Sequence, residues 1–72
     1  MTLDKVAVGG AVKIARLNGA GPVKRRIMDM GLTKGTEVKV CKIAPLGDPI
    51  QLTVRGYELS IRKDDAAAIE VA

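Results

Sequence analysis

The apolar and polar positions of residues 50–61 alternate around a central pair, Arg55-Gly56. If the chain folds back at this pair, the apolar pairs are Val54 with Tyr57, Leu52 with Leu59 and Ile50 with Ile61. The polar pairs are Gln51 with Ser60 and Thr53 with Glu58. One apolar and one polar face predict a half-buried antiparallel hairpin. A slip of one residue would turn every apolar side chain toward water, so the register is well specified.

Three further segments are expected to be strands, namely residues 11–17, 37–43 and 69–71. Their inward-facing residues are expected to include Val12, Ile14, Val38 and Val40. Leu17 breaks the alternation of the first segment, which suggests a bulge or a strand end there. The N-terminal residues 2–10 offer Leu3, Val6 and Val8 for burial.

Residues 22–30 have the spacing of a short helix that follows the first long strand. Pro22 opens it, and Gly31 is a natural residue for its C-terminal end. Val23, Ile27 and Met30 recur on one side and form a buried stripe.

Asp64 is expected to cap a second, single helical turn over residues 65–68. About five antiparallel strands with one short inserted helix predict an all-β, partly open SH3-like barrel. Residues 1–72 should form one such domain.

The composition limits how this barrel is stabilised. The chain of 72 residues has one cysteine, Cys41, no histidine and one aromatic residue, Tyr57. An intramolecular disulfide and a Cys/His zinc site are therefore excluded, and the core must be aliphatic. A core of this size is marginal, so a partner or weak self-association is a further source of stability to consider.

The same composition leaves little room for catalysis. A Cys–His or Ser–His nucleophile pair cannot be built without histidine. The carboxylates Asp48, Glu58, Asp64 and Asp65 fall on a loop, a strand and a helix start, and nothing in the sequence predicts a cleft that pairs them. We therefore expect no enzyme activity, no catalytic residues, no cofactor and no metal ligands.

The net charge of +4 is a modest excess, concentrated at Lys24-Arg25-Arg26. Gly19 and Gly21 before this cluster resemble half of an anion-binding loop, but the third glycine is missing and a turn before a helix explains them better. Nucleic acid is a poor candidate partner because strand-binding barrels use stacking aromatics, and only Tyr57 is available.

The start of the chain and its cysteine usage indicate a compartment. Residues 1–5 lack the apolar stretch of a signal peptide, and a single cysteine suits the reducing cytosol. No apolar run approaches the roughly 20 residues that a membrane span needs. We expect a cytoplasmic protein that does not insert into a membrane and is recruited to its inner face by a partner.

Several motifs together resemble the FeoA family, the small cytosolic partners of the bacterial ferrous-iron transporter FeoB. The resemblance runs from about Leu3 to Val71. The residues that carry it are Gly9, Arg26-Ile27-Met28-Asp29-Met30-Gly31-Leu32 with Gly35, Ala44-Pro45-Leu46-Gly47-Asp48-Pro49, Arg55-Gly56 and Leu59-Ser60-Ile61-Arg62. Ile27 stands where the family more often has leucine, which preserves volume.

The resemblance implies an SH3-like barrel that acts as an accessory to a membrane transporter with a cytosolic GTPase domain. Two alternatives are a free-standing barrel that binds nucleic acid and a relative of the domain that closes some metal-dependent repressors. The second is disfavoured because the first strand begins too close to Met1 for a preceding DNA-binding domain. The hypothesis for the partner surface comprises Arg25, Arg26, Met28, Leu32 and Leu46.

Overall fold

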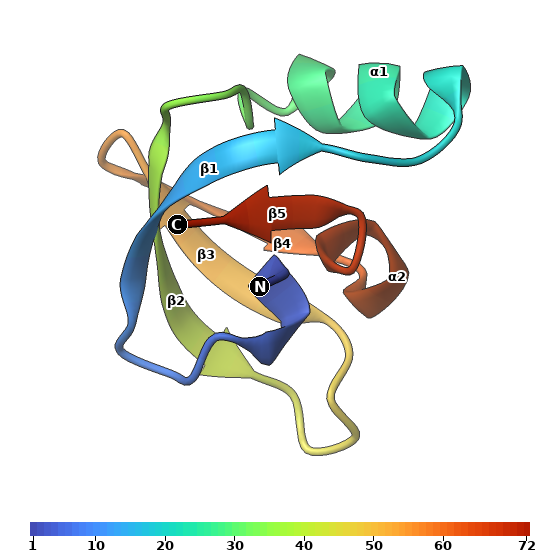
Figure 1. Ribbon diagram of the computed structural model, residues 1–72. Helices are drawn as coiled ribbons and strands as arrows, with labels where there is room; N and C mark the ends of the chain where they lie inside the picture. Colours follow the sequence, from blue (N-terminus) through green and yellow to red (C-terminus); the bar gives the residue numbers. More distant parts are fainter.

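The computed structural model describes all 72 residues as one strongly bent, five-stranded sheet in the order β4-β3-β2-β1-β5 (Figure 1). Every strand pairing is antiparallel, and the two end strands are not paired with each other, so the barrel stays open. The elements are a 3-10 turn η1 (Leu3–Lys5), β1 (Ala11–Leu17), α1 (Gly21–Asp29), β2 (Glu37–Ile43), β3 (Ile50–Val54), β4 (Tyr57–Ile61), α2 (Lys63–Ala66) and β5 (Ile69–Val71).

The hairpin of β3 and β4 confirms the predicted register at all five pairs, from Ile50 with Ile61 to Val54 with Tyr57. Both turn residues have positive φ, 50° at Arg55 and 84° at Gly56. Glycine takes such angles at little cost, whereas a side-chain-bearing residue is strained there. Arg55 therefore holds a backbone conformation that asparagine or glycine would take more easily.

Strand β1 is shared by both halves of the barrel. Its first part pairs with β2, where Lys13 lies opposite Glu37, and its second part pairs with β5, where Leu17 lies opposite Ile69. A register shift lies between Ile14 and Arg16. The predicted strand end at Leu17 is confirmed, and the bulge lies just before it. This irregularity lets one strand turn from one partner to the other.

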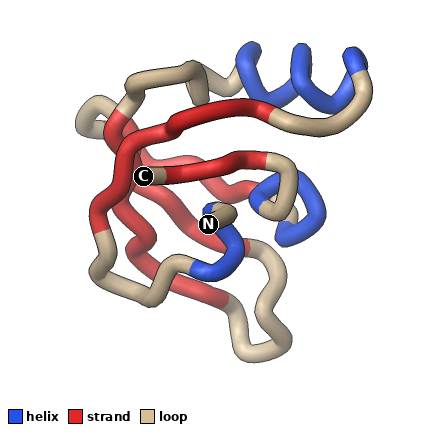
Figure 2. The backbone as a smooth tube through the Cα atoms, viewed as in Figure 1, coloured by secondary structure: helices blue, strands red, loops and turns tan.

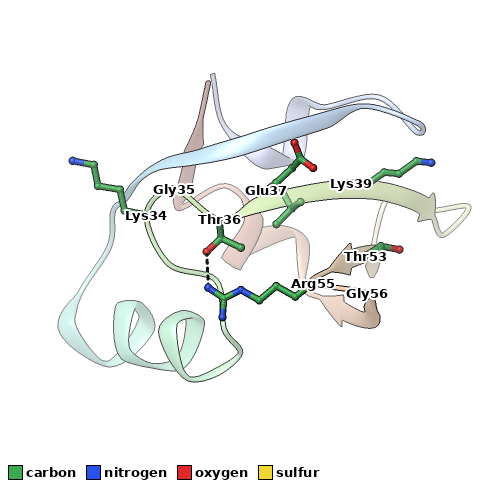
Figure 3. Close-up of a pocket in the computed structure, with 9 residues that line it drawn as sticks. Lys34, Gly35, Thr36, Glu37, Lys39, Thr53, Arg55 and Gly56 are labelled. Carbon is green, nitrogen blue, oxygen red and sulfur yellow. Dashed lines mark hydrogen bonds between the residues drawn. The ribbon is translucent and has the colours of Figure 1, made fainter.

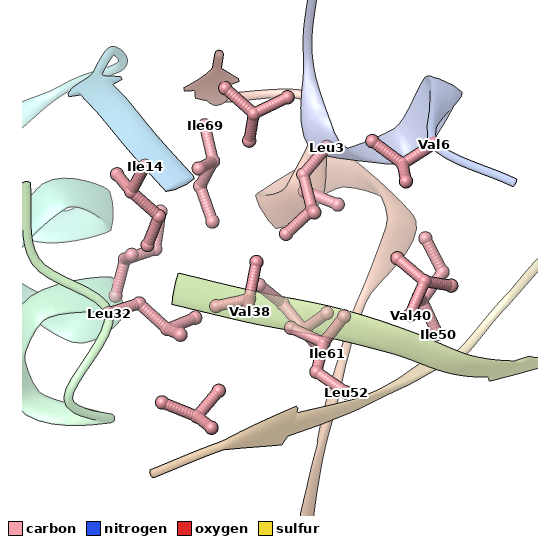
Figure 4. Close-up of a cluster of buried hydrophobic side chains, with 14 residues drawn as sticks. Leu3, Val6, Ile14, Leu32, Val38, Val40, Ile50, Leu52, Ile61 and Ile69 are labelled. Atoms are coloured by element: carbon pink, nitrogen blue, oxygen red, sulfur yellow. The ribbon is translucent and has the colours of Figure 1, made fainter. Parts of the chain in front are cut away.

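The barrel encloses one aliphatic core, as the sequence predicts (Figure 4). Its buried members are Leu3, Val6, Ile14, Ile27, Leu32, Val38, Val40, Ile50, Leu52, Val54, Ile61, Ala66, Ile69 and Val71. The expected burial of Val8 is wrong, since this side chain is 57% exposed. Val8 lies in the turn between η1 and β1, a segment that Figure 2 draws as loop.

Helix α1 lies across one end of the barrel, beside the end of β1 (Figure 1). Ile27 is fully buried, and Val23 and Met30 pack against the core, so the predicted stripe is confirmed. The helix ends at Asp29, and Gly31, which follows the cap residue Met30, has a φ of +89°. This left-handed residue turns the chain so that Leu32 enters the core.

The second helix differs from its prediction. It begins at Lys63, and Arg62 rather than Asp64 occupies the cap position without a side-chain cap of its own. The Asp48 carboxylate accepts a hydrogen bond from the Lys63 backbone N–H at 3.0 Å. The carboxylate that accepts a hydrogen bond at the helix start is thus Asp48 and not the predicted Asp64. Because Asp48 lies on a loop distant in the sequence, the helix can begin before Asp64.

Candidate functional site

The outer face of α1, formed by Lys24, Arg25, Met28 and Asp29, is a basic surface with an apolar centre. Met28 is 48% exposed, and the other three side chains are exposed as well. Together with Gly21 they line a shallow hollow. None of the four makes an ion pair within the chain. Methionine and arginine are enriched in protein interfaces, whereas lysine and aspartate are depleted, so Met28 and Arg25 are the members of this face that suit contact with another protein.

Arg26 has an internal role. Its Nη2 lies 2.7 Å from Oδ1 of Asp65, and Arg62 approaches the other oxygen of the same carboxylate at 3.4 Å. The Asp65 side chain is only 7% exposed, so α1 and α2 are joined through a buried carboxylate. We therefore assign Arg26 to holding α1 in place rather than to the outer face of α1.

The two arginines also set the ionisation of Asp65. Burial would raise the pKa of this carboxyl, but the hydrogen bond from Arg26 and the charges of Arg26 and Arg62 outweigh it. The pKa of Asp65 is consequently lowered from its ordinary value of 3.8. The carboxylate stays ionised at neutral pH and stabilises both arginine contacts.

We expect Asp65→Asn to lower the free energy of unfolding by about 1–2 kcal/mol at pH 7, because charged hydrogen bonds are lost from a buried group. Since the folded pKa lies below the unfolded one, the carboxylate stabilises the fold above about pH 4, and this is lost as pH falls through the folded value. Urea unfolding between pH 7 and pH 2.5 should show the two proteins converge in acid. Asp64→Asn, an exposed neighbour, is the control; equal stability of the Asp65→Asn variant and the parent at pH 7 would contradict the assignment.

Two other members of the predicted partner surface lie elsewhere. Leu32 is fully buried in the core, so its placement at the surface is wrong. Leu46 is 94% exposed, as predicted, but it sits on the loop between β2 and β3. That loop and α1 lie at opposite ends of the molecule, so Leu46 does not share one surface with Arg25 and Met28 (Figure 1). Arg25 and Met28 are the members that the structure brings together.

A contact that sequence reasoning missed links the hairpin tip to the end of α1. The Tyr57 hydroxyl donates a hydrogen bond to the Met30 carbonyl at 3.2 Å. A Cβ at Gly31 would lie 2.8 Å from that hydroxyl oxygen. Tyr57 therefore packs against Gly31, which has no side chain to obstruct it. Its hydrogen bond to Met30 holds the C-terminal end of α1 in place.

A second surface feature, also missed, is an open groove beside the hairpin tip (Figure 3). Its lining residues are Lys34, Gly35, Thr36, Glu37, Val38, Lys39, Thr53, Arg55 and Gly56, and we call it the basic groove. It encloses about 660 Å³, a size typical of ligand sites, but only one lining residue is apolar, unlike a small-molecule pocket. These residues come from two stretches of the chain, 34–39 and 53–56, so no single local motif predicts the groove.

The described residues offer little for metal or nucleophile chemistry. No group of three or more His, Cys, Asp or Glu side chains could hold a metal ion. Cys41 is half-buried, and its Sγ lies 2.8 Å from the Thr53 hydroxyl. No helix has the length and apolar character needed to cross a membrane. The surface carries two hollows lined by basic side chains, one on α1 and one beside the hairpin tip.

Comparison with known proteins is consistent with this picture. A family model described as the FeoA domain matches residues 1–72. The chain belongs to the FeoA family. It is 38% identical over 71 residues to a fusion protein of Porphyromonas gingivalis, the Fe(2+) transport protein A/Fe(2+) transporter FeoB fusion protein. The match covers 99% of this chain and 8% of that relative, so the chain corresponds to a small part of it.

Solved structures agree with the family assignment and define the fold. The NMR structure of a FeoA-like protein from Clostridium acetobutylicum is 43% identical, with a TM-score of 0.93 over 100% of this chain and 84% of that one. The crystal structure of Stenotrophomonas maltophilia FeoA complexed with zinc, described as a procaryotic SH3 domain protein, is 24% identical. Its TM-score is 0.85 over 100% of this FeoA chain and 89% of that one, which confirms the SH3-like fold.

Proposed function

We propose that this FeoA chain is a non-enzymatic accessory protein of bacterial ferrous-iron uptake. In this proposal it docks on the cytosolic, GTPase-bearing part of a FeoB-type transporter and regulates or assembles it. It acts on the cytosolic side of the membrane, where its partner recruits it, and does not insert into the bilayer itself.

The observation that carries the proposal is the covalent union of the two proteins in the Porphyromonas gingivalis relative. There, a region 38% identical to this chain over 71 residues belongs to one polypeptide named for both FeoA and FeoB. Fusion keeps two domains at high effective concentration, which favours a weak contact between them. A barrel that is not fused to its transporter lacks this advantage. Its surface must therefore bind the transporter strongly enough without a covalent connection.

The outer face of α1 is the surface that best fits this role. Met28 provides an exposed apolar contact, and Lys24 and Arg25, which make no ion pair within the chain, lie beside it together with one carboxylate, Asp29. Two contacts hold the C-terminal half of the helix, the Arg26–Asp65 ion pair and the hydrogen bond from Tyr57 to the Met30 carbonyl. A rigid surface loses little conformational entropy on binding, which favours recognition.

The direct test is binding of the purified chain to the cytosolic portion of a FeoB-type transporter from the same organism, measured by biolayer interferometry. We expect saturable binding that weakens with added salt, because cations surround Met28. GTP turnover measured on the chain alone should equal that of buffer. Absence of binding at high micromolar chain would contradict the docking role, and turnover by the chain alone would contradict its non-enzymatic character.

A further inference from the structure

The basic groove is lined by charged side chains of both signs, which is not the pattern of a site for a single small anion. Three cationic side chains, Lys34, Lys39 and Arg55, line it, and a single carboxylate, Glu37, lies between them. None of these four makes an ion pair within the chain. Lys13 lies opposite Glu37 in the β1–β2 pairing but is not one of the residues that line the groove.

The cations are spread out rather than gathered. Figure 3 shows Lys34 and Lys39 at opposite ends of the groove, with Glu37 between them and Arg55 below. Side chains that cage one phosphate or carboxylate must converge on it, and these do not. The arrangement suits an extended ligand that meets one cation after another.

Arg55 gives independent reason to regard the groove as functional. It holds a φ of 50°, although asparagine or glycine would relieve the strain of this turn position. Its guanidinium reaches over the groove to the Thr36 hydroxyl at 3.4 Å, a long and weak contact (Figure 3). The turn itself does not require arginine at position 55. A role for the guanidinium, whose hydrogen bonds are not all made within the chain, explains this residue better.

The walls of the groove are held firmly. The Gly35 N–H donates to the Ile14 carbonyl at 2.7 Å, and the Thr36 carbonyl accepts from the Ile14 N–H at 2.9 Å. Lys39 and Thr53 are paired residues of β2 and β3. The charges therefore project from a rigid sheet and its attached turn.

We propose that the basic groove binds an extended acidic peptide segment of a protein partner, in which two acidic clusters flank a neutral or basic residue. The acidic clusters meet Lys34 with Arg55 on one side and Lys39 on the other, and the intervening residue faces Glu37. A nucleic-acid strand fits less well, because its uniform charge meets Glu37 and no aromatic side chain lines the groove for stacking. The proposal concerns a different face from the outer face of α1 and does not depend on which protein α1 contacts.

Two labelled peptides of identical composition test the charge pattern by fluorescence anisotropy at low salt. The segmented peptide is Asp-Asp-Asp-Gly-Lys-Gly-Asp-Asp-Asp, and the block peptide places all its aspartates together before Gly-Lys-Gly. We expect the segmented peptide to bind about threefold more tightly, as one exposed charge contact allows. Glu37→Gln should abolish that difference. Equal binding of the two peptides by the parent, or no binding of either, would overturn the proposal.

Variants then locate the site. Arg55→Asn should retain the fold, since asparagine suits the turn, and weaken the segmented peptide by about fivefold. Lys5→Gln removes the same charge from a position outside the groove and should leave binding within about twofold, because distant surface charges are screened. If both variants weakened peptide binding equally, the attraction would be nonspecific, and this result would overturn the assignment of the groove as the binding site. Tighter binding of oligothymidylate than of the segmented peptide would replace the peptide with a nucleic-acid strand.

Discussion

Replacing Leu52 by alanine should lower the free energy of unfolding by about 2–5 kcal/mol, the range for buried leucine truncation. Leu52 is fully buried on β3, the strand between β2 and β4, opposite Val40 on one side and Leu59 on the other. Truncation would leave a cavity at the centre of the sheet's inner face. Because domains of this size are marginally stable, the loss could remove most of the folded population at 37 °C.

Urea or thermal unfolding followed by circular dichroism measures the loss. Leu46→Ala is a matched control with the same chemical change, since Leu46 is 94% exposed and its truncation should alter stability by no more than about 0.5 kcal/mol. A Leu52→Ala variant that melts together with the parent and the control would contradict the central place of Leu52 in the core.

Gly31→Ala should be the second most destabilising change, at roughly 2–3 kcal/mol. Alanine at a φ of +89° incurs a backbone cost of about 1–2 kcal/mol. Its Cβ would also lie 2.8 Å from the Tyr57 hydroxyl oxygen, which must then move and lose its hydrogen bond to Met30, at about 1 kcal/mol.

A double-mutant cycle with Tyr57→Phe separates these two costs. Phenylalanine lacks the hydroxyl, so Gly31→Ala in that background should cost only the backbone part, about 1 kcal/mol less than in the parent. Gly35→Ala is a control for the backbone cost, because Gly35 has a similar φ of +87° and no atom within 4 Å of its Cβ position. Identical costs of Gly31→Ala with and without the hydroxyl would show that the close contact is unimportant.

Much of the fold is predictable because strand signals are local. The alternation of residues 50–61 gave the hairpin register, and the bounds of β1, β2 and β5 agree with the predicted ranges. Helix α1 was also recognisable, since Pro22 and Gly31 mark its ends and Val23, Ile27 and Met30 mark its buried side. In each case, the neighbours in sequence determine which face is buried.

Features that depend on distant segments were not predictable in this way. Leu32 was expected on the partner surface, but Gly31 redirects the chain and Leu32 is buried. Asp64 looked like a cap, but Asp48 from another loop satisfies the helix start. Arg26 belongs to an ion pair with a residue 39 positions away, and the basic groove is lined by two distant stretches, residues 34–39 and 53–56. The exposure of Met28 and Arg25 on α1 was therefore predictable from the helical spacing, whereas the burial of Leu32 was not.

The most direct measurement for the docking role is the affinity of the double variant Met28→Asp with Arg25→Glu for the transporter's cytosolic portion. A matched control, Val8→Asp with Lys5→Glu, changes one exposed apolar and one basic side chain to acids away from α1. If both variants fold like the parent, the α1 variant should bind at least about tenfold more weakly, since central interface residues commonly contribute more than 1 kcal/mol each. The control should bind within about twofold of the parent; parental affinity of the α1 variant would show that the outer face of α1 is not the docking surface.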